Sequence, residues 1–288
     1  MNKRPVEKQA ALVIGATGFV GTSLVKCLEA SAVRVFRTSR RSPSSSLRVD
    51  VLNINSIERA VRATDPTLVV NASVGSRSVD DEASTRALQE GSKNIALALR
   101  QAQSSAHLLH IGSYLELQSP WVGEELDGQE YLNSKIVGTQ QLSLQAKSLK
   151  TRFSIIFLGS LIASPLPNGS FASLALNSVA SGSKLCLSDP GQMRDYVPRW
   201  ALCAATSRIL RDLEKHHRLA AVSGLEYSRA DFLTTLGALW RLNKQSSEGA
   251  APSEFPLGQP TLFNKNLATY PKAVCPLEKT LQSELFGD

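Results

Sequence analysis

The sequence has no long hydrophobic run. A membrane-spanning helix needs roughly 20 consecutive apolar residues, and no segment of the 288 residues approaches that length. The first residues, Met1-Asn2-Lys3-Arg4, lead into charged residues rather than into the apolar core of a signal peptide. We therefore expect a soluble, cytoplasmic protein that has no membrane partner.

Cysteine is scarce, and the basic residues are mostly scattered along the chain. The 4 cysteines (Cys27, Cys186, Cys203 and Cys275) form no Cys-x-x-Cys pair and have no histidine at ligand spacing, so we predict no metal site and buried free thiols. The net charge of +7 comes from scattered basic residues, apart from a cluster at 37–41. Such scattering argues against a nucleic-acid partner and fits a phosphate-bearing small ligand.

Short apolar runs alternate with helical patterns through the first half of the chain. We expect strands at 11–15, 33–36, 47–51, 67–70, 108–111 and 153–158, and helices at 22–30, 57–63, 82–103 and 131–149. Because parallel neighbours require crossover connections, this order predicts an α/β fold with a doubly wound parallel sheet, a Rossmann fold.

The alternation stops after Ser164, where prolines and glycine introduce a patchwork of short helices and loops. We expect a dinucleotide-binding domain at 1–164. Residues 165–288 would then form mostly a smaller, substrate-binding lobe, with the option that the chain crosses back to the first domain. Residues 245–260 are rich in Ser, Gly and Pro and are expected to form a solvated loop.

A glycine-rich turn follows the first expected strand and opens a helix. In this turn Gly15 allows a sharp exit from the strand, Gly18 lets backbone amides approach a pyrophosphate, and Gly21 permits close packing of the helix. The helix N-terminus then faces the phosphates. The cofactor contacts expected here are Gly15, Thr17, Gly18, Phe19, Val20 and Gly21.

The end of the second expected strand offers cations rather than an acid. The sequence there is Phe36-Arg37-Thr38-Ser39-Arg40-Arg41. A carboxylate at this position would suit a bare ribose, whereas a guanidinium suits a 2′-phosphate. Ser39, Arg40 and Arg41 therefore favour NADP(H), with NAD(H) as the alternative. A plain solvated loop is the other interpretation of these arginines.

Tyr131 and Lys135 are four residues apart, so both project from one face of a helix. An ammonium next to a phenol stabilises phenolate, which suits proton transfer to a developing alkoxide. The simpler alternative is an amphipathic helix with a snorkelling lysine. A second donor to the ketone oxygen is expected from Ser113 at a strand end, with Tyr114 as the rival.

The four histidines are not expected to take part in catalysis or metal binding. His110 falls within a strand and is predicted to pack in the core, while His216 and His217 sit in a charged run that we interpret as an exposed helix end.

These motifs together resemble the extended short-chain dehydrogenase/reductases, the NAD-dependent epimerase/dehydratase family of nucleotide-sugar enzymes. Further similarities are Asn71-Ala72-Ser73, Gly91-Ser92-Lys93-Asn94 and Gly191-Gln192-Met193-Arg194-Asp195-Tyr196-Val197. The resemblance implies that Ser113, Tyr131 and Lys135 form a catalytic triad, that Asp50 and Val51 contact adenine, and that Ala72 and Ser73 contact the cofactor. It also implies that Arg194 reaches the substrate diphosphate and that Ser113 and Tyr114 contact the sugar.

The sequence departs from the family pattern at several positions. Arg199-Trp200 replaces a pair of aspartates, Phe157-Leu158-Gly159 lacks the usual Arg-Pro, and the interval from Ser113 to Tyr131 is short. Within the family, Gly112-Ser113-Tyr114-Leu115-Glu116 and the expected NADP(H) site look most like reductases of nucleotide-linked 4-keto-6-deoxy sugars.

The expected function is therefore NADPH-dependent reduction of the C4 ketone of a nucleotide-diphospho-4-keto-6-deoxyhexose. One alternative is an epimerase or dehydratase that retains NAD, although Glu116 is the only carboxylate near Ser113 in this stretch. The other is a non-catalytic NADP(H)-binding sensor. A homodimer through the helices at 82–103 and 131–149 is also expected from the resemblance.

Overall fold

The computed structural model describes residues 9–41, 47–73, 82–118, 130–244, 259–260, 268–270 and 275–286. The chain divides into two compact units, one of residues 1–157 with 206–219 and one of residues 158–205 with 220–288. The first unit is therefore assembled from two separate stretches of chain. The division after residue 164 that the sequence suggested stays a prediction.

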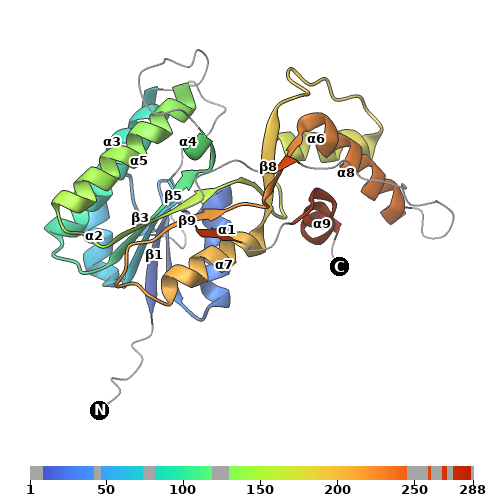
Figure 1. The fold of residues 1–288 in the computed structure, drawn as a ribbon. Coiled ribbons are helices and arrows are strands. Elements are labelled where there is room, and N and C mark those ends of the chain that lie inside the picture. The colour runs from blue at the N-terminus through green and yellow to red at the C-terminus, as the bar shows by residue number, and fades with distance from the viewer. Residues whose placement is uncertain are drawn as a thin grey trace. The chain divides into compact units, whose positions relative to one another are not determined.

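A parallel sheet forms the centre of the fold and confirms the predicted Rossmann-like class. The strands are β1 (Ala10–Ile14), β2 (Arg34–Ser39), β3 (Leu47–Arg48), β4 (Leu68–Asn71), β5 (His107–Ser113), β6 (Phe153–Leu158), β9 (Arg218–Ala221) and β12 (Ala268–Tyr270). Their order is β12-β9-β6-β5-β4-β1-β2-β3 (Figure 1). The register pairs among β1 to β5 are parallel, for example Leu12 with Phe36 and with Val69.

The central strands are mostly apolar and almost entirely buried because both faces of the sheet are covered. Every residue of β4 and of β6 is buried, as is β1 after its first residue. The helices between the strands are α1 (Phe19–Ala30), α2 (Ile54–Thr64), α3 (Glu82–Gln101), α4 (Leu115–Gln118) and α5 (Glu130–Ser148). In Figure 1, α2, α3 and α5 lie on one side of the sheet and α1 lies on the other.

The helices α3 and α5 pack closely along their length (Figure 1). Their contact depends on Gly138, where an added Cβ would lie 2.4 Å from the backbone oxygen of Leu88. A larger residue would push α5 away from α3. Since Tyr131 and Lys135 both belong to α5, this contact fixes the position of the helix that carries them.

The second unit has a smaller sheet and its own apolar core. Its strands β7 (Ser160–Ile162), β8 (Met193–Pro198), β10 (Leu225–Ser228) and β11 (Gln259–Pro260) have the order β11-β10-β8-β7, and its helices are α6 (Phe171–Ser181), α8 (Arg229–Lys244), α9 (Leu277–Leu281) and the π-helix η1 (Gln282–Phe286). Helix α7 (Arg199–Leu210) contains residues of both units, because the division falls between residues 205 and 206. The ring of Phe232 lies 5.1 Å from that of Phe171 and 4.6 Å from that of Tyr196.

The prediction of short helices and loops after Ser164 is wrong for this unit. Helix α8 has 16 residues and starts with a reciprocal cap, in which Ser228 Oγ accepts from the Asp231 amide at 3.0 Å and Asp231 Oδ2 accepts from the Ser228 amide at 3.0 Å. This capping box is visible in the sequence and marks a helix start. Most of residues 245–260, expected to be a loop, lies outside the described residues.

The prediction of four buried free thiols is correct only for Cys275. Cys27 and Cys203 are disulfide-bonded, and Cys186 is free but exposed. Spacing along the chain could not reveal this because cysteine pairing depends on the folded arrangement. Among the described residues, no group of His, Cys, Asp and Glu is arranged to hold a metal ion. None of the helices in the same residues is both long and apolar enough to cross a membrane.

Candidate active site

The glycine turn between β1 and α1 leaves no space for side chains. Gly15 has φ +83°, a conformation that favours glycine, and a Cβ on it would lie 2.7 Å from the Ala72 backbone oxygen. A Cβ on Gly21 would lie 2.0 Å from the Gly15 oxygen, whereas one on Gly18 would meet that oxygen at 3.3 Å. The turn is thus packed against the residues that follow β4, and Gly15 and Gly21 are its tightest points.

The N-terminus of α1 has no side-chain cap. Gly18 occupies the N-cap position and supplies no side-chain hydrogen bond, and the first turn contains no acidic residue. Helix N-termini leave backbone amides without intrahelical partners, and these amides can bind an anion. Thr17 and Gly18 are exposed at this end, while Phe19 and Val20 are half-buried in the first turn.

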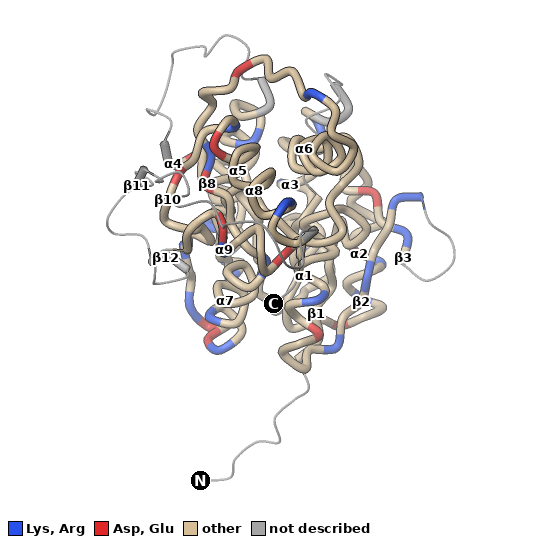
Figure 2. Tube along the Cα trace, turned by 90° about the vertical axis from the view of Figure 1, so that its right-hand side faces the viewer, with Lys and Arg blue, Asp and Glu red and all other residues tan. Residues whose placement is uncertain are grey.

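Arginines follow the end of β2. Ser39 is buried and its Oγ accepts a hydrogen bond from the Arg41 amide at 3.3 Å, while the side chains of Arg40 and Arg41 are exposed. Arg37 differs from them because its guanidinium pairs with Glu29 Oε1 at 2.7 Å. Figure 2 shows Lys and Arg gathered along β2 and beside β3.

Asp50 and Val51 are held in the turn after β3. The Asp50 carboxylate accepts from the Leu52 amide at 3.0 Å, and the Val51 oxygen accepts from Asn94 Nδ2 at 3.0 Å. A Cβ on Gly91 would lie 2.6 Å from Val51 Cγ2, so α3 approaches this turn closely. The segment containing Gly91 and Asn94, which the resemblance singled out, thereby positions Val51.

A buried polar network joins β4, β5 and α5. Asn71 Oδ1 accepts from the Ser73 amide at 3.2 Å, so its amide nitrogen points to His110 Nδ1, 3.1 Å away. Nδ1 must then be the acceptor, and the ring carries its proton on Nε2, which lies 3.1 Å from Thr139 Oγ1. Burial, with Lys135 contributing in the same direction, lowers the pKa of His110 to about 3, so the ring stays neutral.

The predicted core role of His110 is therefore correct but incomplete. Besides filling the core, its ring connects the end of β4 to the helix that carries Lys135. Asn71, Ser73, Ser92, His110, Lys135 and Thr139 also surround a cavity of about 10 Å³, the space of one water molecule. Sequence reasoning did not identify Thr139 as part of the site, because a threonine in a helix carries no signal of its own.

Ser113 and Glu116 both cap the turn at the end of β5, Glu116 through its carboxylate and Ser113 through its hydroxyl. The Ser113 amide donates to Glu116 Oε1 at 2.6 Å, and Ser113 Oγ accepts from the Leu115 amide at 3.3 Å. This is the capping-box pattern Ser-x-x-Glu, readable from the sequence. Ser113 is half-buried, whereas its rival Tyr114 is 1% exposed.

Glu116 is a buried carboxyl beside the expected catalytic residues. It is 6% exposed, and its Oε2 has no hydrogen-bond partner among the described residues. Burial raises the pKa of Glu116, and the charge of Lys135, the Ser113 amide, the Thr139 hydroxyl and Arg218 oppose the rise. The sequence identified Glu116 as the only carboxylate near Ser113 but gave it no role in the reduction.

Lys135 is buried in α5 with 7% of its surface exposed, and its charge acts on both Glu116 and His110. Tyr131 lies one turn earlier in the same helix, and its side chain lies outside the described part of the structure. The first unit thus brings together the glycine turn, Ala72, Ser73 and the Lys135 region at the carboxyl ends of β1, β4 and β5.

Arg194 belongs to the second unit. It lies half-buried on β8, and its Nη1 donates to the Met193 oxygen at 2.7 Å. The neighbouring Asp195 is fully buried, and its carboxylate accepts from the amides of Ser223 and Gly224 at 2.5 and 3.0 Å. Within this motif, Asp195 therefore has a structural role, because it anchors the turn before β10.

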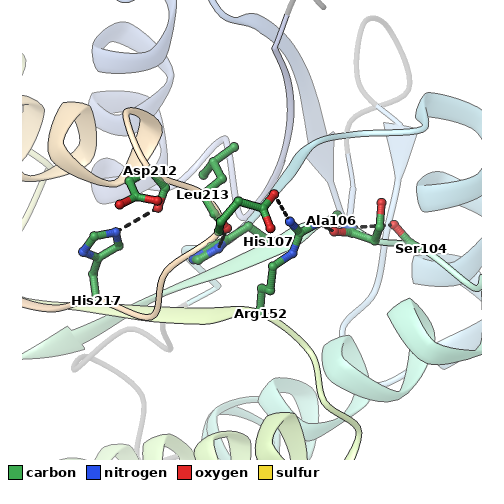
Figure 3. Close-up of polar contacts among 9 residues, drawn as sticks. Ser104, Ala106, His107, Arg152, Asp212, Leu213 and His217 are labelled. Atoms are coloured by element: carbon green, nitrogen blue, oxygen red, sulfur yellow. Dashed lines mark hydrogen bonds and ion pairs between the residues drawn. The ribbon is translucent and has the colours of Figure 1, made fainter.

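The other histidines lie in a separate polar cluster at the amino ends of β5, β6 and β9 (Figure 3). His107 bonds through Nδ1 to the Leu213 oxygen at 2.7 Å and through Nε2 to Ser154 Oγ at 2.8 Å, and burial lowers its pKa to about 4. Arg152 contacts Glu214 in the same cluster.

The prediction of an exposed helix end is wrong for His217. Helix α7 already ends at Leu210, and His217 is 9% exposed, with Nε2 2.9 Å from the Asp212 oxygen. The charged residues that precede His217 suggested an exposed position, but the chain enters the core just before β9.

A model of the NAD dependent epimerase/dehydratase family matches residues 11–218. The chain belongs to this family. It is accordingly an NAD(P)-dependent enzyme of the extended short-chain dehydrogenase/reductase type. A search of curated proteins finds no match.

Solved structures share the fold at low sequence identity. UDP-glucose 4-epimerase of Thermus thermophilus, in complex with NAD, is 20% identical, with a TM-score of 0.67 over 96% of this chain and 93% of that one. The WbmG enzyme of Bordetella bronchiseptica, in complex with NAD, is 17% identical, with a TM-score of 0.69 over 97% and 88%. UDP-glucose 4-epimerase of Thermotoga maritima, with UDP-glucose, is 15% identical, with a TM-score of 0.70 over 97% and 98%.

Proposed function

We propose that the protein reduces the C4 ketone of a nucleotide-diphospho-4-keto-6-deoxyhexose with NADPH. The observation that carries this proposal is the end of β2, where the exposed Arg40 and Arg41 follow Ser39 and no carboxylate occurs. A 2′-phosphate pairs with guanidinium through charge-assisted hydrogen bonds, whereas a bare ribose is held by an acid.

The residues of the first unit suit a dinucleotide. Gly15 and Gly21 form a cradle that a Cβ would fill, and the uncapped α1 terminus offers amides to a pyrophosphate. When bound, the nicotinamide supplies a hydride to the carbonyl carbon. The fit of these residues, which does not depend on the identity of the sugar, supports a nicotinamide dinucleotide.

In the proposed mechanism, Tyr131 donates its phenolic proton to the oxygen that gains charge, and the Lys135 ammonium stabilises the phenolate left behind. The Ser113 hydroxyl oxygen accepts from the Leu115 amide, so its proton is available to the substrate oxygen. Tyr114 would contact the sugar from the same segment, and Lys135 would also hydrogen-bond the nicotinamide ribose.

The substrate class is proposed on the family and on Arg194. The Thermotoga enzyme was solved with UDP-glucose and a WbmG structure with UDP. A guanidinium at Arg194 suits the diphosphate of such a substrate.

A second candidate is an epimerase or dehydratase that retains NAD. It is favoured by the solved relatives, which include three 4-epimerases, and also a dTDP-glucose 4,6-dehydratase in complex with NAD. Such an enzyme returns the hydride to the sugar and keeps its cofactor, whereas a reductase releases oxidised cofactor. A non-catalytic sensor would be recognised by a Tyr131→Phe variant with unchanged biological output.

The test is to mix purified protein with NADPH or NADH and with TDP-, CDP-, GDP- and UDP-linked 4-keto-6-deoxy sugars, and to follow the nicotinamide absorbance. Stoichiometric loss of NADPH with one sugar, largely abolished in Tyr131→Phe while cofactor binding persists, is the expected result. Absence of loss, together with NAD released on denaturation, would favour the second candidate.

We also propose a cytoplasmic homodimer formed through α3 and α5. Leu144 on α5 is a large apolar side chain that is 69% exposed, and a partner seated on this helix would cover it. Sedimentation should show a dimer that Leu144→Glu weakens, and a monomer at all concentrations would contradict the proposal.

A further inference from the structure

Glu116 is the buried titratable group that the proposed mechanism does not use. Its carboxyl lies against the strand backbone, since a Cβ on Gly112 would come within 3.1 Å of Glu116 Oε1 and of Phe157 Cδ1. Its Oε1 is occupied by the Ser113 amide at 2.6 Å, while Oε2 is buried and makes no hydrogen bond to the described residues. A plain helix cap would leave this second oxygen in water, so the burial needs another explanation.

Several charged or titratable groups face this carboxyl. Lys135 acts on it from α5 and Arg218 from the start of β9, and both favour its charged form. His110 on β5 is kept neutral because burial, together with the charge of Lys135, lowers its pKa, so it adds no charge. Burial raises the pKa of Glu116 and favours its neutral form, whereas the charge of Lys135, which also belongs to the proposed catalytic pair, favours the carboxylate. Only the ionised carboxyl can offset the charge of Lys135.

The contacts of Ser113 depend on the same carboxyl. Glu116 holds the Ser113 amide, and the Leu115 amide occupies one lone pair of the Ser113 hydroxyl oxygen, so the hydroxyl keeps its proton to donate and one lone pair. Without the carboxyl, the Ser113 amide would lose its acceptor, and the direction of the Ser113 hydroxyl proton would no longer be fixed.

We propose that Glu116 is a positioning residue of the active site, which directs the Ser113 hydroxyl through Oε1 and offsets the charge of Lys135 through its carboxylate. The inference rests on the proposed carbonyl reduction. Glu116 then has two separable roles. The hydrogen bond to the Ser113 amide depends on the length of its side chain, and the effect on Lys135 depends on its charge.

Two conservative variants separate these roles. Glu116→Gln keeps an oxygen that can accept from the Ser113 amide but removes the charge, whereas Glu116→Asp keeps the charge but is one methylene too short to hold the amide. Glu90→Gln is the matched control, because Glu90 is an exposed carboxylate that pairs with Arg86 on the surface of α3.

In Glu116→Gln the Lys135 charge is no longer offset, so the Tyr131 phenolate is better stabilised. Reduction requires protonated Tyr131, and the alkaline limb of kcat should therefore move to lower pH by on the order of one unit. In Glu116→Asp the limb should stay in place while kcat falls about tenfold, and KM for the cofactor should change little. Glu90→Gln should alter none of these values.

A second readout does not need turnover. The phenolate absorbance of Tyr131 should appear at lower pH in Glu116→Gln. It is obtained by titrating each protein and subtracting the titration of the same protein with Tyr131→Phe added. If no sugar is turned over but this shift occurs, the reductase proposal fails and the inference on Glu116 stands. Unchanged titration and unchanged kcat in both variants, with native thermal unfolding, would overturn it.

Discussion

Asn71 Nδ2 donates a hydrogen bond to His110 Nδ1 at 3.1 Å, and this bond connects the end of β4 to β5. This contact fixes which nitrogen of the ring carries the proton, while burial keeps His110 uncharged by lowering its pKa to about 3. A protonated ring would present a hydrogen to the Asn71 amide, whose orientation is held by Ser73. Stability should therefore depend on keeping the ring neutral.

We expect the free energy of unfolding to fall as the pH is lowered through the range below 6.5. His107 and His110 have folded-state pKa values lowered to about 4 and about 3, so the unfolded chain binds their protons first. Each histidine should remove up to about 1.4 kcal/mol per pH unit in this window, levelling off below its folded pKa. Urea unfolding at several pH values measures the slope. The His107→Gln/His110→Gln double variant should have a flatter profile, and an equally steep one would contradict the explanation.

The glycine turn predicts a graded series of variants. Gly15→Ala and Gly21→Ala should weaken cofactor binding more than tenfold, a loss above about 1.4 kcal/mol, because the added Cβ would clash with backbone. Gly18→Ala should be milder, since its nearest contact would be at 3.3 Å. Titration of NADPH fluorescence gives the affinities. Gly237→Ala in α8 is the control: nothing lies within 4 Å of the added Cβ, so binding should be unchanged. Equal affinities in all four variants would refute the cradle.

Arg40 and Arg41 should select the cofactor. Replacing both with alanine should weaken NADPH binding by about 1.5–3 kcal/mol, the value of a hydrogen bond to a charged group, and should leave NADH binding nearly unchanged. Arg37→Ala is the control, because it removes a nearby arginine within β2 that is already paired with Glu29. If Arg37→Ala lost as much NADPH affinity as the double variant, the selectivity would reflect the general charge of β2.

Asp195 and Arg194 are neighbours in the second unit, and their variants should affect different properties: stability for Asp195 and substrate binding for Arg194. Asp195→Ala leaves the buried amides of Ser223 and Gly224 without their acceptor, and we expect a loss of about 2–4 kcal/mol in thermal or chemical unfolding. Arg194→Ala should instead raise KM for the nucleotide sugar with little change in unfolding. A destabilised Arg194→Ala with unaltered KM would assign Arg194 a structural role.

The fold was predictable because its signals are local. The apolar strand that leads into Gly15, and the buried run of β6, specify strands whatever surrounds them, and the observed bounds of β6 are the predicted ones. Helix ends shifted by a few residues, as at α3, which ends at Gln101 instead of 103. The class could therefore be inferred from periodicity and turn residues alone.

The polar network of the site was not predictable in the same way. The contact from His110 to Thr139 joins a strand to a helix across 29 positions of sequence, and no spacing rule encodes it. Glu116 is an intermediate case, because its capping pattern with Ser113 is local but its burial is not. The disulfide-bonded state of Cys27 and the burial of His217 also depend on tertiary structure.

The place of β9 beside β6 has a consequence for synthesis on the ribosome. Residues 159–205, nearly all of the intervening chain, belong to the other unit, so β6 emerges long before its neighbour. Until residues 218–221 leave the exit tunnel, the apolar edge of β6 is open to pairing with other nascent chains. A chain released before that point would be a substrate for chaperones rather than a smaller functional enzyme.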